Sequence, residues 1–398
     1  MQIQTYWLLL IPLLFGLGWI AARWEMRLQE HEDDVEQAKK ARSTFRGINL
    51  LLNEQHDKAI DALVEVAQLD PETTELHFAL GSLFRRRGET ERAIRVHQHL
   101  SNRQDIRPKD RAHASYELGR DFLRAGMLDR AEASLNLVTE GRYNLPAKVA
   151  LLEMYQIEKD WRKAIIAATE LELLEEKSYK EQIAHFYCEI AQEAIRAKNI
   201  NAAKEAIEHA LQAVSHHIRA LIIKGELAII EQNPIEAIAT WGYIEKNTSN
   251  YLYLIADKWI KAYAELGRED EGLQQLIPHL KEQGAGELLD VIFKNYLRLS
   301  GPDKALELLN QVMLDTPSLT AMTKRYETEH LLAQANQDPV TMAQTKASFE
   351  LLKHRTNSLA RYTCSNCGFR ARRYYWQCPG CNRWDVYSPK RSEGLSGL

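Results

Sequence analysis

With 398 residues, the chain is too long for one ordinary hydrophobic core, so we expect two or more structural units. Its formal net charge is −4, which excludes a chain that binds polyanions along its whole length. Only 19 Gly and 11 Pro argue against a loop-rich all-β protein, and five cysteines argue against a disulfide scaffold. We therefore expect a mostly α-helical protein in which any basic surface is local.

The first predicted element is a transmembrane anchor within residues 1–22. Residues 6–22, YWLLLIPLLFGLGWIAA, form an uncharged run of 17 residues, the short end of the range for a spanning helix. A cleaved signal peptide is the alternative, but the preceding MQIQT carries no basic side chain. Arg23 and Arg27 follow the run, so the positive-inside rule predicts that the bulk of the chain is cytoplasmic. Residues 23–42 are predicted to form a charged juxtamembrane helix.

A helical repeat is predicted over residues 43–317. A small residue opens the packing face of each predicted second helix, at intervals of 34, 38, 33, 39, 34, 35 and 33 residues. These positions are Ala59, Ala93, Ala131, Ala164, Ala203, Ala237, Gly272 and Ala305. The sequence thus resembles the tetratricopeptide repeat family over about eight units, which predicts an α-solenoid. Residues 318–358 are predicted to form irregular helices that cap the array.

The resemblance to tetratricopeptide repeats implies a concave, partner-binding face built from the first helices. Arginines, aromatic residues and one histidine map onto this face in the second, third and fifth units. They are Phe78, Arg85, Arg86, Tyr116, Arg120, Arg124 and His185. Such a groove suits an acidic partner segment, while a solvated basic face without a partner is the alternative.

Residues 359–398 hold four of the five cysteines and are predicted to form a small metal-binding domain. The spacing is C-x2-C-x10-C-x2-C, and the predicted ligands are Cys364, Cys367, Cys378 and Cys381. Gly368 and Asn382, one after each pair, are residue types that tolerate positive φ, which turns backbone N–H groups toward the sulfurs. One Fe or Zn ion fits four thiolates, and the sequence does not choose between them.

The stretches CSNCGF and WQCPGC resemble the metal-binding knuckles of rubredoxins. The two pairs of electron-carrying rubredoxins lie much further apart in sequence, so we favour a structural or docking role and keep electron transfer as an alternative. A basic patch with aromatic residues is predicted beside the cysteines. It consists of Arg370, Arg372, Arg373, Trp376 and Arg383. Such a patch suits an acidic protein surface, the repeat array or anionic lipid, and RNA binding is a further alternative.

Catalytic motifs are not found in this sequence. It lacks a P-loop, a zinc-protease motif, a nucleophile elbow and a dinucleotide-binding glycine cluster, so we predict that the protein is not an enzyme. The fifth cysteine, Cys188, is predicted to be a buried free thiol on a helix.

The order of anchor, charged helix, helix pairs and metal domain resembles the lipopolysaccharide assembly protein B family of Gram-negative bacteria over essentially the entire chain. The most specific stretches are IAHFYCE, YTCSNCGF and YWQCPGC. The resemblance implies a single-pass inner-membrane adaptor with a periplasmic N-terminus. Its implied partners are the membrane AAA+ protease, the deacetylase that commits carbon to lipid A, and other lipopolysaccharide-synthesis or transport proteins. The adaptor would promote proteolysis of the deacetylase, and nucleic acid is not an expected partner.

Overall fold

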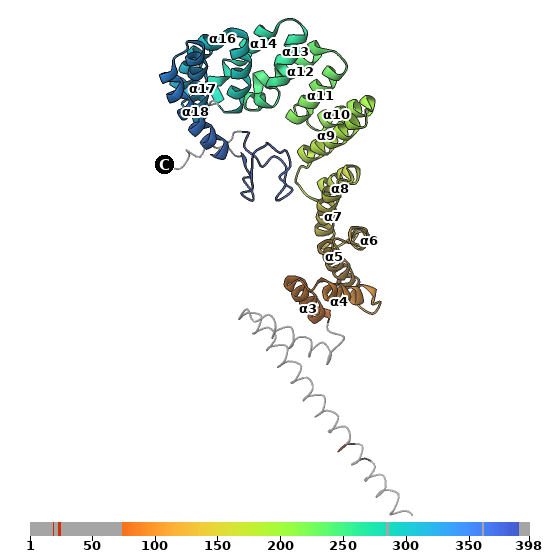
Figure 1. Ribbon diagram of the computed structural model, residues 1–398. Coiled ribbons are helices and arrows are strands. Elements are labelled where there is room, and N and C mark those ends of the chain that lie inside the picture. The colour runs from red at the N-terminus through yellow and green to blue at the C-terminus, as the bar shows by residue number, and fades with distance from the viewer. Residues whose placement is uncertain (1–18, 20–22, 25–73, 284–285, 360–361, 390–398) are drawn as a thin grey trace, which may run out of the picture. The chain divides into compact units, whose positions relative to one another are not determined.

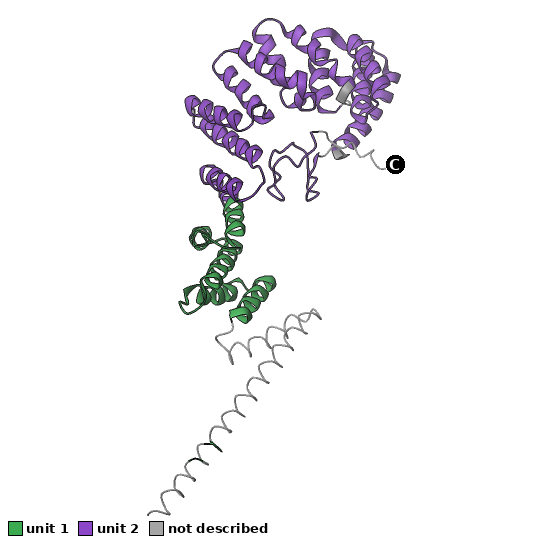
Figure 2. Cartoon of the chain, turned by 180° about the vertical axis from the view of Figure 1, so that it is seen from behind, with its two compact units in different colours: residues 1–154 green, residues 155–398 purple. Residues whose placement is uncertain are grey.

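The computed structural model describes Trp19, Arg23 and Trp24, together with residues 74–283, 286–359 and 362–389 (Figure 1). The predicted anchor, the juxtamembrane helix and the first repeat unit with Ala59 therefore lie almost wholly outside the described residues. No helix among the described residues combines the length and the apolar character needed to cross a membrane. The chain divides into two compact units, residues 1–154 and residues 155–398 (Figure 2).

The described part of the first unit is helical. It contains α3 (Thr74–Arg87), α4 (Thr90–Asn102), α5 (Pro108–Arg124) and α6 (Leu128–Asn136), and α7 (Asn144–Glu158) crosses into the second unit. Turn chemistry explains the boundaries. Gly88 and Gly126 follow α3 and α5 with φ of 86° and 72°, a conformation that ends helices and that glycine adopts without strain. Pro108 begins α5, where its missing N–H is not needed.

The described part of the second unit is also mostly helical (Figure 1). It contains α8 (Trp161–Leu174), α9 (Lys180–Arg196), α10 (Ile200–Ala213), α11 (Ile218–Ile230), α12 (Pro234–Asn247), the 3-10 helix η1 (Ser249–Leu254), α13 (Ala256–Glu265), α14 (Glu269–Leu276), α15 (His279–Gln283), α16 (Glu287–Asp315), α17 (Leu319–Ala335) and α18 (Pro339–Leu359). Within α16, Gly301 has φ 82° and ψ 171° just before Pro302, so two helices meet at a kink. This kink divides α16 into the two helices of one repeat.

The small residues of the repeat are buried where helices cross closely. The six described alanines of the series, Ala93, Ala131, Ala164, Ala203, Ala237 and Ala305, are all 0% exposed. Two glycines on first helices lie directly against large side chains of the second helix of the same pair. A Cβ at Gly225 would lie 2.2 Å from the Trp241 indole, and one at Gly81 would lie 2.3 Å from the His97 ring. The close helix crossings predicted at small residues are therefore confirmed for the described repeat units.

The described chain ends in a small metal domain within the second unit. Strand β1 (Tyr362–Thr363) pairs antiparallel with β2 (Arg370–Ala371), with Tyr362 opposite Ala371. Isolated bridges join Cys364 to Tyr387 and Gln377 to Trp384. The sequence prediction of a mostly α fold with a small C-terminal metal-binding domain therefore holds for the described residues, while the transmembrane part is untested.

Candidate metal centre

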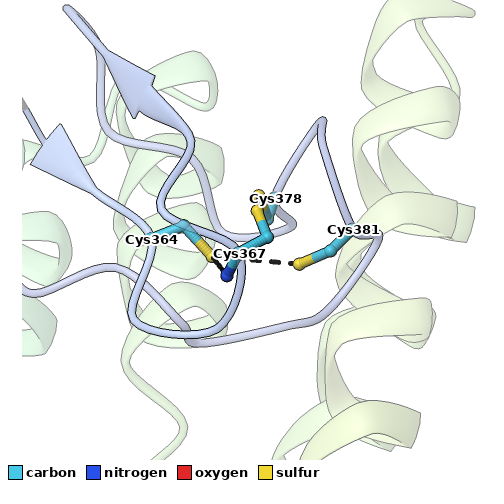
Figure 3. A group of neighbouring side chains, drawn as sticks. All are labelled: Cys364, Cys367, Cys378 and Cys381. Atoms are coloured by element: carbon cyan, nitrogen blue, oxygen red, sulfur yellow. Dashed lines mark hydrogen bonds between the residues drawn. The ribbon is translucent and has the colours of Figure 1, made fainter.

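The metal domain brings the four cysteine sulfurs together, and they point toward one another in Figure 3. All four sulfurs lie within 4.8 Å of one another. The Sγ atoms of Cys364 and Cys381 are 3.8 Å apart, and those of Cys367 and Cys378 are 3.7 Å apart. These separations exceed the roughly 2.05 Å of a disulfide bond. They match the edge of about 3.8 Å that a tetrahedron with metal–sulfur bonds of about 2.3 Å has.

Two backbone knuckles position the sulfurs in the same way. The N–H of Gly368 donates to the Cys364 carbonyl, and the N–H of Asn382 donates to the Cys378 carbonyl, at 3.0 and 2.8 Å. Gly368 and Asn382 have φ of 74° and 55°, so the positive φ predicted at both positions is confirmed. Backbone N–H groups also approach sulfur, from Cys367 to Cys364 and from Gly380 to Cys378, both at 3.4 Å. Such donors stabilise thiolates, the form that binds metals.

The electrostatics of the site suit a cation. Burial opposes ionisation of Cys378, yet the Tyr387 hydroxyl and backbone N–H groups lower the pKa of its thiol to about 6. At Cys367 a backbone hydrogen bond from Phe369 lowers the pKa, but desolvation and contacts with the other three sulfurs raise it to about 12. Four thiolates this close repel one another, so a divalent ion is needed to keep all four ionised. The donor set suits Zn or Fe equally.

Trp384, three residues after the last cysteine, packs the metal domain onto the helices of the same unit. Its ring stacks on His185 of α9 at 4.7 Å and 19°, and meets Phe186 and Trp161 edge-on. Its indole N–H donates to Gln156 Oε1 at 2.8 Å. His185 is 0% exposed, and its Nε2 lies 2.6 Å from Asp385 Oδ2. One tryptophan and one carboxylate thus join the second knuckle to α9.

A second contact joins the metal domain to η1. Trp376 stacks on Tyr251 at 5.7 Å and 14°, and Tyr253 stacks on Tyr362 at 6.3 Å. Tyr374 meets both η1 tyrosines edge-on. Figures 1 and 2 both show residues 362–389 on the inner side of the arc of α9 to α18. The metal domain therefore lies against the helices rather than extending away from them.

The His185 contact rests on a buried polar layer in the second unit. His217 meets the His185 ring edge-on at 4.4 Å, and its Nδ1 lies 3.8 Å from the Cys188 sulfur. Burial, with the neighbouring His185, lowers the pKa of His217 to about 3, and burial raises the pKa of Cys188 to about 12. Cys188 is 0% exposed, so the predicted buried free thiol is confirmed. Both side chains are neutral at pH 7.

The predicted groove residues of the first unit have different surroundings. Arg86, Arg120 and Arg124 are exposed. Arg85 is only 8% exposed, and its guanidinium pairs with the carboxylates of Glu117 and Asp121. Arg85 therefore stabilises the repeat, because its charge is used inside the unit. The two aromatics, Phe78 and Tyr116, are half-buried and take part in ring stacks with His113 and Tyr143.

The remaining predicted partner-binding residues lie in the second unit. His185 is fully buried beneath Trp384, so it is not open to a partner, while Trp376 is half-buried against Tyr251. The four arginines of the predicted basic patch are exposed, and they are Arg370, Arg372, Arg373 and Arg383. Partner binding by the exposed arginines of both units stays a prediction.

Sequence reasoning missed the contacts that hold the metal domain. Gln156, His217, Tyr251 and Tyr253 had no assigned role, and the Trp384 and Asp385 contacts span about 200 residues of sequence. Local spacing carries no information on such contacts. The available signal was the placement of aromatic residues around the cysteines, which a domain this small cannot bury by itself.

The fold and the site together define a class of protein, a helical-repeat protein with a four-cysteine metal-binding domain packed against its helices. Residues 46–97 match the family described as tetratricopeptide repeat, and residues 362–386 match the family described as rubredoxin metal binding domain.

Relatives of known name cover nearly the whole chain. Lipopolysaccharide assembly protein B of Escherichia coli (strain K12) is 29% identical, over 98% of each chain. The protein of the same name from Haemophilus influenzae is 27% identical, over 96% of this chain and 97% of its own. The resemblance predicted from the sequence is therefore confirmed, because this chain is similar to proteins named lipopolysaccharide assembly protein B over nearly its full length.

Solved structures give a weaker likeness. MamA 41-end from Desulfovibrio magneticus RS-1 is 19% identical, with a TM-score of 0.33, over 44% of this chain and 94% of its own. YrrB, a tetratricopeptide repeat protein with an unusual peptide-binding site, is 14% identical, with a TM-score of 0.32, over 46% of this chain and 90% of its own. At these TM-scores, no conclusion about this chain follows.

Proposed function

We propose that this protein is a non-enzymatic adaptor of lipopolysaccharide assembly. One observation carries the proposal, namely that relatives named lipopolysaccharide assembly protein B match 96–98% of the chain, repeats and metal domain included. A repeat array supports an adaptor, because stacked helix pairs offer an extended surface for other proteins. The four-cysteine centre supports a structural role, because its sulfurs hold a small domain together.

The finer proposal concerns the partners. The adaptor presents the deacetylase that commits carbon to lipid A to the membrane AAA+ protease, promotes its degradation and gathers other lipopolysaccharide-synthesis proteins. Residues 6–22 anchor it in the inner membrane, with its N-terminus in the periplasm and its bulk in the cytoplasm. The apolar run and the basic residues after it support this placement.

The half-life of the deacetylase tests this proposal. Deletion of the gene should lengthen the half-life and raise lipopolysaccharide content, because the substrate is no longer presented to the protease. Deletion of residues 1–22 alone should have the same effect, because the adaptor then leaves the membrane. An unchanged half-life in the complete deletion strain would contradict the adaptor proposal.

The exposed arginines of the first unit allow a sharper test of substrate capture. The double variant Arg86→Glu and Arg124→Glu should lengthen the half-life, because it reverses charge in the predicted groove while keeping the buried Arg85 pair. Arg120 is left unchanged, because its guanidinium lies 3.7 Å from the Glu117 carboxylate of that pair. The matched control reverses two exposed arginines of second helices, Arg95 and Arg162. If both double variants act alike, the groove assignment is wrong although the adaptor role stands.

A further inference from the structure

The metal domain carries arginines that its internal contacts do not use. Residues 362–389 contain four basic side chains, all arginine, and a single acidic one, Asp385. The basic residues are Arg370, Arg372, Arg373 and Arg383, and all are exposed. Within the part of the chain that the structure describes, no ion pair or hydrogen bond engages any of these guanidinium groups. Their charge is therefore available to another molecule.

Nearby negative charge does not neutralise the cluster. The Asp385 carboxylate lies against His185 of α9. Four thiolates around a divalent ion carry a formal charge of about −2, but no guanidinium of the cluster hydrogen-bonds to a sulfur among the described residues. On the helices of the same unit, by contrast, Arg219 pairs with Glu189 and Arg298 pairs with Glu269.

Two aromatic rings lie among these arginines in the sequence and are partly exposed. Phe369 is 42% exposed and Tyr375 is 39% exposed. Phe369 is next to Arg370 in sequence and close to the second knuckle, because a Cβ at Gly380 would lie 3.2 Å from its side chain. Trp384 packs on α9, Trp376 packs on η1, and Tyr387 is buried within the metal domain. Packing on the helices therefore leaves these two rings and the arginines open.

We propose that this arginine surface, defined by Phe369, Arg370, Arg372, Arg373, Tyr375 and Arg383, binds an acidic segment of another protein. The planar guanidinium fork matches a carboxylate, and arginine with aromatic residues is the composition of interface hot spots. An anionic membrane fits less well, because both rings are more than half buried and reach bilayer depth poorly. The inference goes beyond the proposed function, because it requires no particular pathway.

Peptide binding to the full-length, metal-loaded protein in detergent tests the proposal. The probe is a fluorescein-labelled 15-residue peptide of Glu and Asp with one central Phe, and its matched partner has Gln and Asn instead. The triple variant Arg370→Glu, Arg372→Glu and Arg373→Glu should weaken binding of the acidic peptide by about tenfold or more, because each lost ion pair becomes a repulsion. Binding should also weaken as salt is raised.

A matched control reverses three exposed cations of the same unit that lie on helices, Arg162, Lys246 and Lys294. It should change the affinity by less than about twofold, because scattered surface charges contribute little. Metal content and tryptophan fluorescence should match the parent in both variants, which shows that the metal domain remains folded and packed.

Several results would overturn the proposal. They are equal weakening by both triples, equal binding of the neutral peptide, and no binding of the acidic peptide. Binding only to phosphatidylglycerol vesicles, lost in the arginine variant, would assign the surface to the membrane instead. None of these outcomes bears on the half-life of the deacetylase, so the two proposals fail independently.

Discussion

In the helices of the second unit, one large core joins residues from α11 to α17, with Trp241, Trp259 and Phe293 among them. The metal domain of the same unit buries a far smaller cluster, made of Tyr362, Cys364, Ala371, Cys378 and Tyr387. Two of those five residues are candidate metal ligands, and Tyr253 of η1 packs against the cluster from outside the domain. The two regions therefore have different sources of stability.

Helical repeats gain stability from each neighbour, since every helix pair buries apolar surface against the next. A domain of about 30 residues cannot bury enough, so it relies on a metal and on an external surface. Here the four cysteine sulfurs can hold the metal. Trp384 and Trp376 pack the domain onto the helices, which provide the external surface. Perturbations of ligands, buried charges and packing should therefore act on the two regions separately.

The largest expected effect follows removal of a metal ligand. Cys378→Ser should abolish metal binding and unfold residues 362–389, because structural metal sites contribute apparent free energies on the order of 10 kcal/mol to such domains. The helices should persist. Metal analysis, limited proteolysis and circular dichroism would check this. Cys188→Ala is the matched control, and loss of helicity in Cys378→Ser would show that the helices depend on the metal.

A buried ion pair in the first unit should give the next largest effect. Glu117→Gln leaves Arg85 with Asp121 alone, and breaking a buried pair costs about 3–5 kcal/mol, measured as loss of the free energy of unfolding. Cysteine ligation should be unaffected, so metal content should stay at the parental level. A stable variant would mean that Asp121 suffices for Arg85.

The same carboxylate predicts a pH dependence. Burial raises the pKa of Glu117, but hydrogen bonds from His113 and Arg85 and the charges of Arg85 and Arg120 outweigh it and lower the value from 4.5 to about 2. A depressed pKa stabilises the fold above pH 4.5, and this contribution of about 3 kcal/mol is lost as pH falls toward 2. Thermal unfolding between pH 5 and 2 should show this slope in the parent and less of it in Glu117→Gln.

The packing of Trp384 between the metal domain and the helices should contribute less free energy than the metal site or the buried ion pair. Trp384→Ala should cost about 2–4 kcal/mol, less than a fully buried tryptophan, and should expose the metal domain to protease while metal remains bound. Trp384→Phe should recover much of the protection, because it keeps the ring stack on His185 and loses only the bond to Gln156. Tyr375→Ala, at a 39% exposed position, should leave protection unchanged. Equal protection in Trp384→Ala would show that the η1 contact and the Asp385–His185 contact hold the domain without this ring.

The smallest effect concerns helix crossing. Gly225→Ala should lower the free energy of unfolding by about 1–3 kcal/mol, because its Cβ would lie 2.2 Å from the Trp241 indole. Gly242→Ala is the matched control within α12, where nothing lies within 4 Å of the added Cβ, and it should be neutral or stabilising by up to about 1 kcal/mol. Chemical denaturation of both variants would check this. A neutral Gly225→Ala would mean that the crossing can widen.

Much of this architecture could be predicted from the sequence because its signals are local or periodic. Small residues near a 34-residue spacing marked the crossings, and alanines such as Ala93 and Ala237 are indeed fully buried. The cysteine spacing marked the metal ligands, since a C-x2-C pair wraps one ion through short-range geometry. Even the positive φ of Gly368 and Asn382 followed from residue type.

The role of individual groove residues could not be predicted in this way. Arg85 and Arg86 are neighbours of the same type, yet one is buried against Glu117 and the other is exposed. Family mapping gives the face of a helix, but which arginine meets a carboxylate depends on the helix packed beside it. His185 was assigned to the groove for the same reason, but the metal domain covers it through Trp384.

The sequence by itself thus determined the repeat, the four ligands and the likeness to a family, because each depends on residues within one turn, one knuckle or one repeat. Only the tertiary structure decided that Trp384 and Asp385 meet His185 across about 200 residues. It also decided which arginines remain open. Contacts of that range depend on how the whole chain folds back on itself, and no local period or spacing encodes them.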